Sequence, residues 1–429
     1  MLLLFAGVAG AQSTHDHDMS GHDMSGHDMA GHEPSLLERA VVQNASGTSW
    51  EPVSTPMYMF SYGELGRWTA MFHGALFAGV DHQGGPRGGT SFASPNQAMA
   101  MAYRPIGGAG QLMLRGMLSA EPLTVGPRGY PLLLQTGETW EGRPLHDRQH
   151  PHDLFMEIAA IGRVAPTSGL GFELYVAPVG EPALGPTAFP HRISAMFDPL
   201  APLGHHWMDS THIAFGVLTA GVFGRSVKLE GSWFNGREPD ENRYDFDLDV
   251  PDSWSGRLTV ALGPDWTVQG SAGWLASPEA LRPGVPLWRI TGSATWNHPY
   301  GDGSNVAATA AWGRNIEAGE FPTDSVLLES TLDPAGPPLL YGRVSREVKS
   351  GHDLVVDPDG PFALGSADLG GAWLFAVGER VEAGLGVRGN VSRLPAALEP
   401  FYGTRTATGV FVYAQLRPAP MSMAGPHDH

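Results

Sequence analysis

The sequence has no cysteine, only two lysines (Lys228 and Lys349), and no long apolar segment after residue 11. Without cysteine the fold does not depend on disulfide bonds, which fits export into an oxidising periplasm. The net charge of −18 would repel a phosphate backbone, so nucleic acid is excluded as a partner. No apolar segment reaches the roughly 20 residues that a membrane-spanning helix requires. A membrane protein with this sequence must therefore be a closed β-barrel, since only helices and closed barrels satisfy every backbone group in lipid.

Alternation with a period of two residues is the main pattern that is present. In the stretch 286–297, apolar side chains occupy one parity and polar side chains occupy the other. The apolar set is Trp288, Ile290, Gly292, Ala294 and Trp296. A strand places alternate residues on opposite faces, and an exposed face of small and aromatic residues is typical of a barrel wall in lipid. The 57 glycines and 36 prolines are spread throughout, so helix is expected only as short segments in loops.

The positions of alternation and turn residues predict an all-β fold, a transmembrane antiparallel β-barrel of about 16 strands. The expected strands are 68–81, 94–104, 110–120, 153–163, 169–177, 211–222, 225–235, 254–262, 265–275, 286–297, 304–314, 324–332, 338–348, 363–377, 380–392 and 405–416. Short connections, such as 106–108 and 223–224, alternate with long ones, such as 121–152, 178–210 and 235–253. Short periplasmic turns and long outer loops alternate in this way in bacterial outer-membrane barrels.

The same pattern divides the chain into segments. Residues 1–11 are apolar, end in small residues and resemble a secretory signal peptide without its positive n-region, which an earlier start would supply; an ordinary apolar N-terminus is the alternative. The remaining expected segments are a disordered His/Met-rich tract (12–35), a linker or plug-like lead-in (36–66), the outer-membrane barrel (67–418) and a His/Met-containing tail (419–429).

The His/Met-rich tract has the ligand composition of a copper site. Its candidate ligands are His15, His17, Met19, His22, Met24, His27, Met29 and His32. Thioether sulfur selects Cu(I), while imidazole takes Cu(II), zinc or nickel as well. A solvated low-complexity tail without a metal is the alternative. The tract is similar to the Met/His-rich N-termini of outer-membrane copper-resistance proteins, which also precede a β-barrel. That resemblance covers about 35 residues and implies a copper ion as the bound metal.

Two of the long loops add a second group of candidate metal ligands. These are His146, His150 and His152 in one loop and His205, His206 and His212 in the next. Because neighbouring strands can bring consecutive loops together, the histidines could form one site at the mouth or in the lumen. Imidazole with nearby carboxylates suits zinc, Cu(II) or nickel. The alternative is a set of hydrogen-bonded histidines that lock an inward-folded loop.

Charged residues on the polar parity are expected to line the pore. They are Glu157, Arg163, Glu173, Lys228, Glu230, Arg289, Arg314, Arg343, Glu382 and Arg388. Charges of both signs inside a barrel pair with one another or are hydrated. The sequence contains no nucleophile elbow, no zinc-protease helix and no phosphate-binding loop, so we do not expect an enzyme.

These observations predict a protein of the Gram-negative outer membrane, embedded in the lipid bilayer, that handles metal ions. Copper binding, resistance or transport is the leading function. A general porin or small-solute channel with an incidental tail is one alternative, and a plugged structural barrel is another. The sequence leaves open the oligomeric state, the direction of transport and whether the lumen is open.

Overall fold

The computed structural model describes residues 34–301, 303–334 and 336–421, and Pro34–Met421 form one compact unit. The expected signal peptide, the His/Met-rich tract up to Glu33 and most of the C-terminal tail lie outside the described residues. Within the described ranges, no helix has the length and apolar character needed to cross a membrane.

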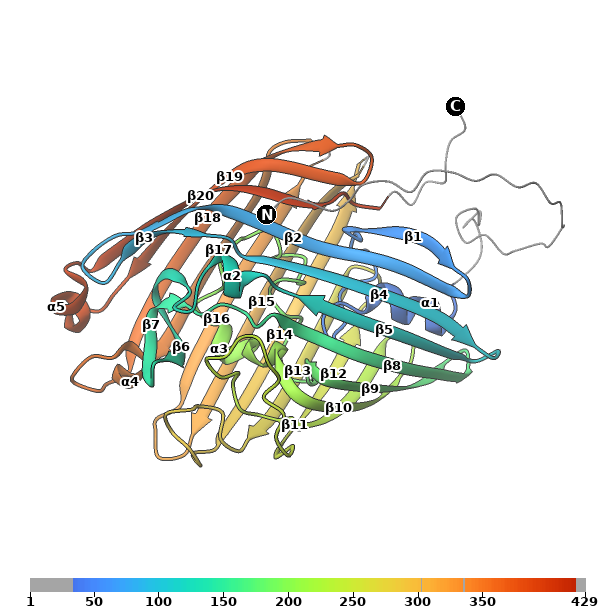
Figure 1. Cartoon of the computed structure of the whole chain (residues 1–429), viewed down its shortest axis with the longest axis horizontal. Coiled ribbons are helices and arrows are strands. Elements are labelled where there is room, and N and C mark those ends of the chain that lie inside the picture. The colour runs from blue at the N-terminus through green and yellow to red at the C-terminus, as the bar shows by residue number, and fades with distance from the viewer. Residues whose placement is uncertain (1–33, 302, 335, 422–429) are drawn as a thin grey trace. The chain divides into compact units, whose positions relative to one another are not determined.

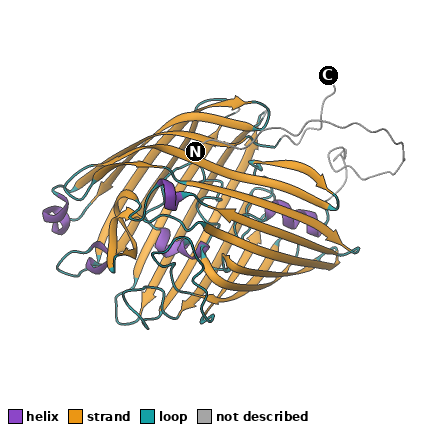
Figure 2. Cartoon of the chain, viewed as in Figure 1, coloured by secondary structure: helices purple, strands orange, loops and turns teal. Residues whose placement is uncertain are grey.

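The fold is a closed antiparallel barrel of sixteen strands, as the sequence predicted (Figures 1 and 2). Neighbours in the barrel follow chain order, and β2 pairs with β20 to close it. The strands are β2 (Trp68–Gln83), β4 (Asn96–Ile106), β5 (Gly110–Leu118), β8 (Phe155–Thr167), β9 (Leu170–Gly180), β10 (Ala214–Phe223), β11 (Val227–Asn235), β12 (Ser253–Ala261), β13 (Trp266–Leu275), β14 (Leu287–Tyr300), β15 (Ser304–Glu317), β16 (Thr323–Asp333), β17 (Leu339–Lys349), β18 (Phe362–Val377), β19 (Val381–Arg393) and β20 (Thr406–Pro418).

Two further strands lie beside β2. The strand β1 (Met59–Leu65) pairs with the first part of β2, while β20 pairs with its second part, Leu76–Gln83. The other edge of β2 pairs with β4 along Thr69–Leu76 and with β3 (Gly89–Ala93) along Gly79–Gln83. The sequence did not predict either short strand.

Connections at one end of the barrel are short turns, and those at the other end are long. The long connections contain the hairpin β6–β7 (Tyr130–Trp140 and Arg143–Gln149) and several single-turn helices. The helices are α2 (Glu121–Thr124), α3 (His205–Met208), η1 (Ser210–His212), α4 (Gly351–Leu354), η2 (Ala396–Leu398) and α5 (Glu399–Tyr402). The hairpin was not predicted from the sequence.

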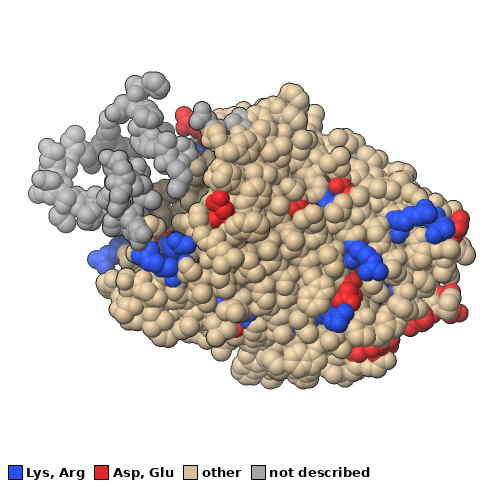
Figure 3. Space-filling model, turned by 180° about the vertical axis from the view of Figure 1, so that it is seen from behind, with Lys and Arg blue, Asp and Glu red and all other residues tan. Residues whose placement is uncertain are grey.

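The outer face of the wall is apolar. On β9, Leu170, Phe172, Leu174 and Val176 are all more than 40% exposed, and the residues between them are buried. Figure 3 shows a broad outer surface with few charged groups. A closed barrel with its apolar side chains turned outward is the arrangement that a bilayer requires.

Tryptophans form rows across neighbouring strands at both ends of this surface. Trp233, Trp254, Trp274 and Trp288 are aligned in register on β11–β14 near the long loops. Near the short turns, Trp266 of β13 is aligned with Trp296 of β14, and their ring centroids are 6.2 Å apart. Aromatic girdles at both interfaces are characteristic of transmembrane barrels.

The lead-in segment lies inside the barrel. Its helix α1 (Leu36–Gln43) begins at Ser35, whose hydroxyl accepts a hydrogen bond from the Glu38 amide while the Glu38 carboxylate accepts one from the Ser35 amide. This capping box satisfies two amides at the helix start. Inner-wall Lys228 donates to the Thr48 carbonyl at 2.7 Å. Helix therefore also occurs outside the loops, contrary to our expectation.

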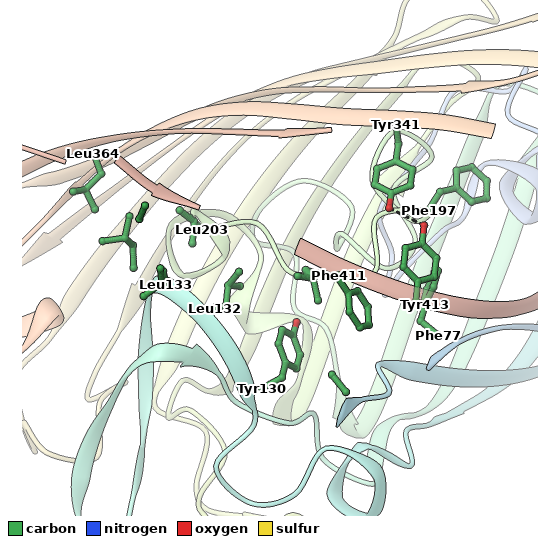
Figure 4. Close-up of a cluster of buried hydrophobic side chains, with 14 of the residues drawn as sticks. Phe77, Tyr130, Leu132, Leu133, Phe197, Leu203, Tyr341, Leu364, Phe411 and Tyr413 are labelled. Atoms are coloured by element: carbon green, nitrogen blue, oxygen red, sulfur yellow. Dashed lines mark hydrogen bonds between the residues drawn. The ribbon is translucent and has the colours of Figure 1, made fainter. Parts of the chain in front are cut away.

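The core of the molecule is within the lumen. Leu132 and Leu133 of β6 and Phe197 and Leu203 of the segment 181–213 pack against the inner wall (Figure 4). Other core residues are labelled in the same view, including Phe77, Tyr130, Tyr341, Leu364, Phe411 and Tyr413, and the Tyr341 and Tyr413 hydroxyls are 2.7 Å apart. Inward-folded segments, rather than solvent alone, thus occupy the interior.

Candidate metal centre

Five histidines from two inward-folded segments meet inside the barrel. His150 and His152 precede β8, while His205 and His206 lie on α3 and His212 lies on η1. The ring centroids are 5.1 Å apart for His205 and His206, 5.2 Å for His205 and His212, and 5.2 Å for His152 and His212. We call these five residues the histidine cluster. For them, the structure agrees with the hypothesis that the two loops bring their histidines together.

Hydrogen bonds to the wall hold α3 in place. Trp207 Nε1 donates to Thr323 Oγ1 at 2.8 Å, and Asn315 Nδ2 donates to the His206 carbonyl at 3.0 Å. Both wall residues lie near the long-loop ends of their strands. A single helical turn would not be stable alone, so these contacts with β15 and β16 fix the direction of its imidazoles.

Three members of the cluster have the geometry of a ligand set. His150, His205 and His206 each offer one ring nitrogen, and these three atoms all lie within 4.8 Å of one another. All three residues are buried. Three imidazoles at this spacing need only small side-chain movements to reach the roughly 2.0 Å bonds of a zinc- or copper-type ion.

Acceptors surround the Nδ1 atoms of the cluster. His205 Nδ1 is 2.8 Å from Asp209 Oδ1, His206 Nδ1 is 3.1 Å from Glu238 Oε1, and His150 Nδ1 is 3.1 Å from Glu138 Oε1. His212 Nδ1 is 2.7 Å from the Asp209 carbonyl oxygen, and His152 Nδ1 is 3.0 Å from Glu121 Oε2 without forming a hydrogen bond. A carboxylate or carbonyl on Nδ1 places the proton there and leaves Nε2 as the electron-pair donor.

The Nε2 atoms lack such partners. Those of His150, His152, His206 and His212 are buried without a hydrogen bond. Burying a polar nitrogen without a partner costs roughly 1–3 kcal/mol, so four such atoms in one place need a physical reason. A cation bound by His150, His205 and His206 would provide a partner for two of them, those of His150 and His206.

The electrostatic environment keeps several of these rings neutral, which is the form that binds a metal. Burial lowers the pKa of His205 to about 4, against the opposing effect of Asp209. Burial, Arg243 and the neighbouring rings hold the pKa of His150 well below its usual value, and burial has the same effect on His212. Burial would also lower the pKa of His152, but the Glu121 carboxylate outweighs it and the pKa is raised.

His146 does not belong to the cluster. Its side chain is 37% exposed, and Nδ1 is 2.8 Å from Asp147 Oδ2, which also pairs with Arg87. We expected it to join the loop histidines, and that expectation is wrong because β7 carries it to the partly exposed side of the hairpin. The candidate ligands from His15 to His32 lie outside the described residues.

The carboxylates around the cluster were not predicted as site residues. Asp209 follows His205 by four residues, a spacing that brings two side chains together on one helical turn, and this signal is visible in the sequence. Glu121 and Glu138 come from distant points of the connection between β5 and β8, and Glu238 comes from the connection between β11 and β12. No local spacing could have assigned them.

An acidic pocket adjoins the cluster at His206. It has a volume of about 60 Å³, and its lining includes Arg282 and Arg289 together with five carboxylates, namely Glu238, Glu279, Glu317, Glu320 and Asp353. The excess of carboxylates would raise the local concentration of cations beside His206.

The predicted pore-lining charges occupy the inner wall with one exception. Glu157, Arg163, Glu173, Lys228, Glu230, Arg289, Arg343 and Arg388 are buried, mostly in ion pairs, and Glu382 is partly exposed and pairs with Arg417. Arg115 and Glu157, for example, are 2.6 Å apart. Arg314 is the exception, because the alternation of β15 turns it outward, where it pairs with Asp324 at 2.8 Å. Placing Arg314 in the lumen was an error of one residue in register.

Comparison with known proteins gives the fold. No family model matches the chain, and no curated protein matches it. Among solved structures, an anion-selective porin from Comamonas acidovorans has a TM-score of 0.50 at 11% identity, covering 82% of this chain and 100% of that one. The OmpF porin of Salmonella typhi has a TM-score of 0.50 at 9% identity, with 82% and 98% covered, and a loop-deletion mutant of Vibrio cholerae OmpT has 0.50 at 10%, with 82% and 99% covered. The chain thus has the sixteen-strand fold of bacterial outer-membrane porins, and its apolar wall places it in that membrane.

Proposed function

We propose that this outer-membrane barrel binds a transition-metal cation in its lumen through the histidine cluster, with Cu(II) as the leading ion and zinc or nickel as competitors. The observation that carries the proposal is the set of three buried imidazoles whose ligand atoms lie within 4.8 Å of one another. The orientation of their Nδ1 atoms toward carboxylates supports it, because metal-binding histidines have this arrangement.

The chain supplies each step of such binding. The acidic pocket gathers cations at the long-loop end, and His206 belongs both to that pocket and to the cluster. The buried, neutral rings then replace water in the coordination shell. Copper is favoured over the other ions by the His/Met composition of residues 12–35, which would serve copper capture, resistance or transport.

A general diffusion channel is the second candidate, and the likeness to porins favours it. The interior argues for a narrower task, because the segments 35–57 and 181–213 both lie within the lumen and contact its wall. Conductance in planar bilayers separates the two candidates. A general porin gives a large, salt-proportional conductance, whereas a metal-binding plug gives a small one.

Thermal unfolding with and without metal tests the proposal. The protein used begins at Pro34, so that the His/Met-rich tract cannot contribute. Only the folded barrel assembles the cluster, so Cu(II) should raise the melting temperature, and a concentration of about 100 times Kd should add roughly 2.7 kcal/mol of stability. The double variant His150→Ala/His205→Ala should lose this shift, since one ligand comes from each segment.

The matched control is His82→Ala/His298→Ala, which removes two histidines whose residues are exposed. This variant should keep the full Cu(II) shift. If the control and the cluster variant respond equally, or if the unmodified protein shows no shift with Cu(II), Zn(II) or Ni(II), the histidine cluster is a structural plug and the proposal fails.

A further inference from the structure

A row of sulfur and nitrogen side chains crosses three neighbouring strands of the inner wall. His73 of β2 is in register with Met99 of β4, and Met99 is in register with Met117 of β5. All three side chains are buried, with residue exposures of 7%, 2% and 3%. Directly aligned residues of antiparallel strands have Cβ atoms about 4.5–5.5 Å apart, so the ends of these side chains can meet.

A second histidine covers the row from the lumen. His191 Nε2 lies 3.1 Å from Met117 Sδ, and the His191 and His73 ring centroids are 5.3 Å apart. The adjacent Pro190 carbonyl accepts a hydrogen bond from Gln97 of β4 at 3.0 Å. The segment that carries His191 is thus attached to the strand that carries Met99.

His73 repeats the pattern seen in the histidine cluster. Its Nδ1 is 2.8 Å from the Tyr58 carbonyl oxygen, and its Nε2 is buried without a hydrogen-bond partner. The carbonyl places the ring proton on Nδ1, so Nε2 presents a lone pair. The buried lone pair lies in a region whose other polar neighbours include a thioether and a second imidazole.

Further methionines surround this row. Met156, which precedes Glu157 on β8, belongs to the same buried cluster as Met99 and Met117, and Met101 packs against it. Methionine often fills irregular gaps in a core, so packing alone is the simpler role. A hydrogen bond to Met117 Sδ accounts for the position of His191, but packing does not explain the buried, unpaired Nε2 of His73 beside these thioethers.

We infer that His73, Met99, Met117 and His191 form a second site, which takes a soft monovalent cation such as Cu(I) or Ag(I). Thioether sulfur prefers soft ions, and two imidazoles complete a four-ligand set. The inference goes beyond the proposed function and holds whether or not the histidine cluster binds a divalent ion. A cavity of about 40 Å³ is lined by both His152 and Met156.

Silver provides the probe, because Ag(I) keeps its oxidation state in air and resembles Cu(I) in its ligand preference. The full barrel from Pro34 onward is labelled with ¹³C at its methionine methyl groups and titrated with Ag(I). Methyl signals of Met99 and Met117 should shift at the first equivalent, while that of Met113 should stay unchanged. Met113 lies on β5, four residues from Met117, in a different buried cluster.

Variants then test the ligands. Met99→Leu/Met117→Leu conserves side-chain volume and should leave the fold intact, as heat-modifiable gel migration would show. It should bind Ag(I) at least tenfold more weakly and lose one equivalent of silver, measured by mass spectrometry after gel filtration. Met113→Leu, the matched control, should keep both values.

The two proposals can be refuted independently of each other. His150→Ala/His205→Ala should retain the methyl shifts with Ag(I), although it loses the Cu(II) response. If Met99→Leu/Met117→Leu binds Ag(I) with the affinity and stoichiometry of the unmodified chain, or if the Met99 and Met117 methyl signals do not move in that chain, the row is packing only and the second site is refuted.

Discussion

Arg192 Nε donates a hydrogen bond to Glu329 Oε1 at 2.5 Å, which ties the inward segment 181–213 to strand β16 of the wall. Both residues are almost completely buried. Arg192 also donates to Asp209 Oδ2 at 3.0 Å, and the other oxygen of Asp209 faces His205. One guanidinium therefore fixes both the position of the segment and the carboxylate that orients a candidate ligand.

Replacing this guanidinium should destabilise the barrel. Arg192→Met leaves the buried Asp209 carboxylate without its guanidinium, while Glu329 keeps Arg343 at 2.9 Å, and breaking such a buried pair costs about 3–5 kcal/mol. The melting temperature in detergent, followed by heat-modifiable migration, measures the loss. Arg314→Met is the control, because its pair with Asp324 is on the outer face and should contribute little to stability. Equal losses in the two variants would show that Arg192 does not anchor the segment.

Gly137 should control access to the histidine cluster. A Cβ added at this residue would lie 2.1 Å from His206 Cε1, so Gly137→Ala must displace the imidazole. We expect the Cu(II)-dependent rise in melting temperature to fall by more than half. Gly142→Ala also adds a methyl group at positive φ, but nothing lies within 4 Å of it, so the Cu(II) response should persist. A full response in Gly137→Ala would contradict the position assigned to His206.

The buried carboxyl groups of Glu51 and Glu181 should contribute stability to the metal-free protein that is lost between pH 5 and pH 8, in opposition to the buried histidines, whose lowered pKa values stabilise the folded state as the pH rises. Burial raises the pKa of Glu51 to about 7 and that of Glu181 to about 8. Because these pKa values lie above the unfolded value of 4.5, the folded state holds protons that the unfolded state has released. The stabilisation present below pH 4.5 is therefore lost as the pH rises through the folded pKa values.

The variant Glu51→Gln isolates one of these groups. It keeps the shape of the side chain and removes the titration, so the decline that Glu51 contributes between pH 5 and pH 8, about 3 kcal/mol at most, should be absent from its free energy of unfolding. Urea unfolding followed by tryptophan fluorescence at pH 5 and pH 8 measures both slopes. A steeper decline in the variant than in the unmodified chain would contradict the burial of this carboxyl group.

Removing the lead-in segment should widen the conducting path. Arg115, Lys228 and Arg257 donate hydrogen bonds to residues 44–48, and a chain that begins at Tyr58 leaves these cations facing water. Its conductance in planar bilayers should exceed several-fold that of a chain beginning at Pro34. If the two chains conduct equally, the lead-in does not obstruct the lumen.

Much of the barrel could be predicted from the sequence because its signal is local. Each strand alternates residues that face the lumen with residues that face outward, so all sixteen strand positions follow from this period and from the turn residues. The helix α1 also had a signal that we did not use, since Ser35 and Glu38 have the spacing of a capping box. The hairpin β6–β7 had no such signal in the sequence, because Leu134 and Glu138 adopt positive φ and interrupt the alternation.

The candidate sites were predictable only in part. His150 and His205 were found as members of histidine-rich loops, but their distance depends on how two loops fold into the lumen. The row of His73, Met99 and Met117 was missed, although each is on the inner parity of its strand, because register between strands is not visible in one sequence. Long-range pairing, more than residue type, limits such predictions.

One edge of β2 pairs with β1 along its first part and with β20 along its second part, and this division has a consequence for how the barrel forms. Its pairing with β1 joins residues that are close in the chain, so this hairpin can form early at little cost in loop-closure entropy. Its pairing with β20 extends over only Leu76–Gln83 and joins residues more than 300 positions apart. Closure at this short seam must therefore await the last strand, which makes the seam the natural rate-limiting step of folding and the first place where the wall would open.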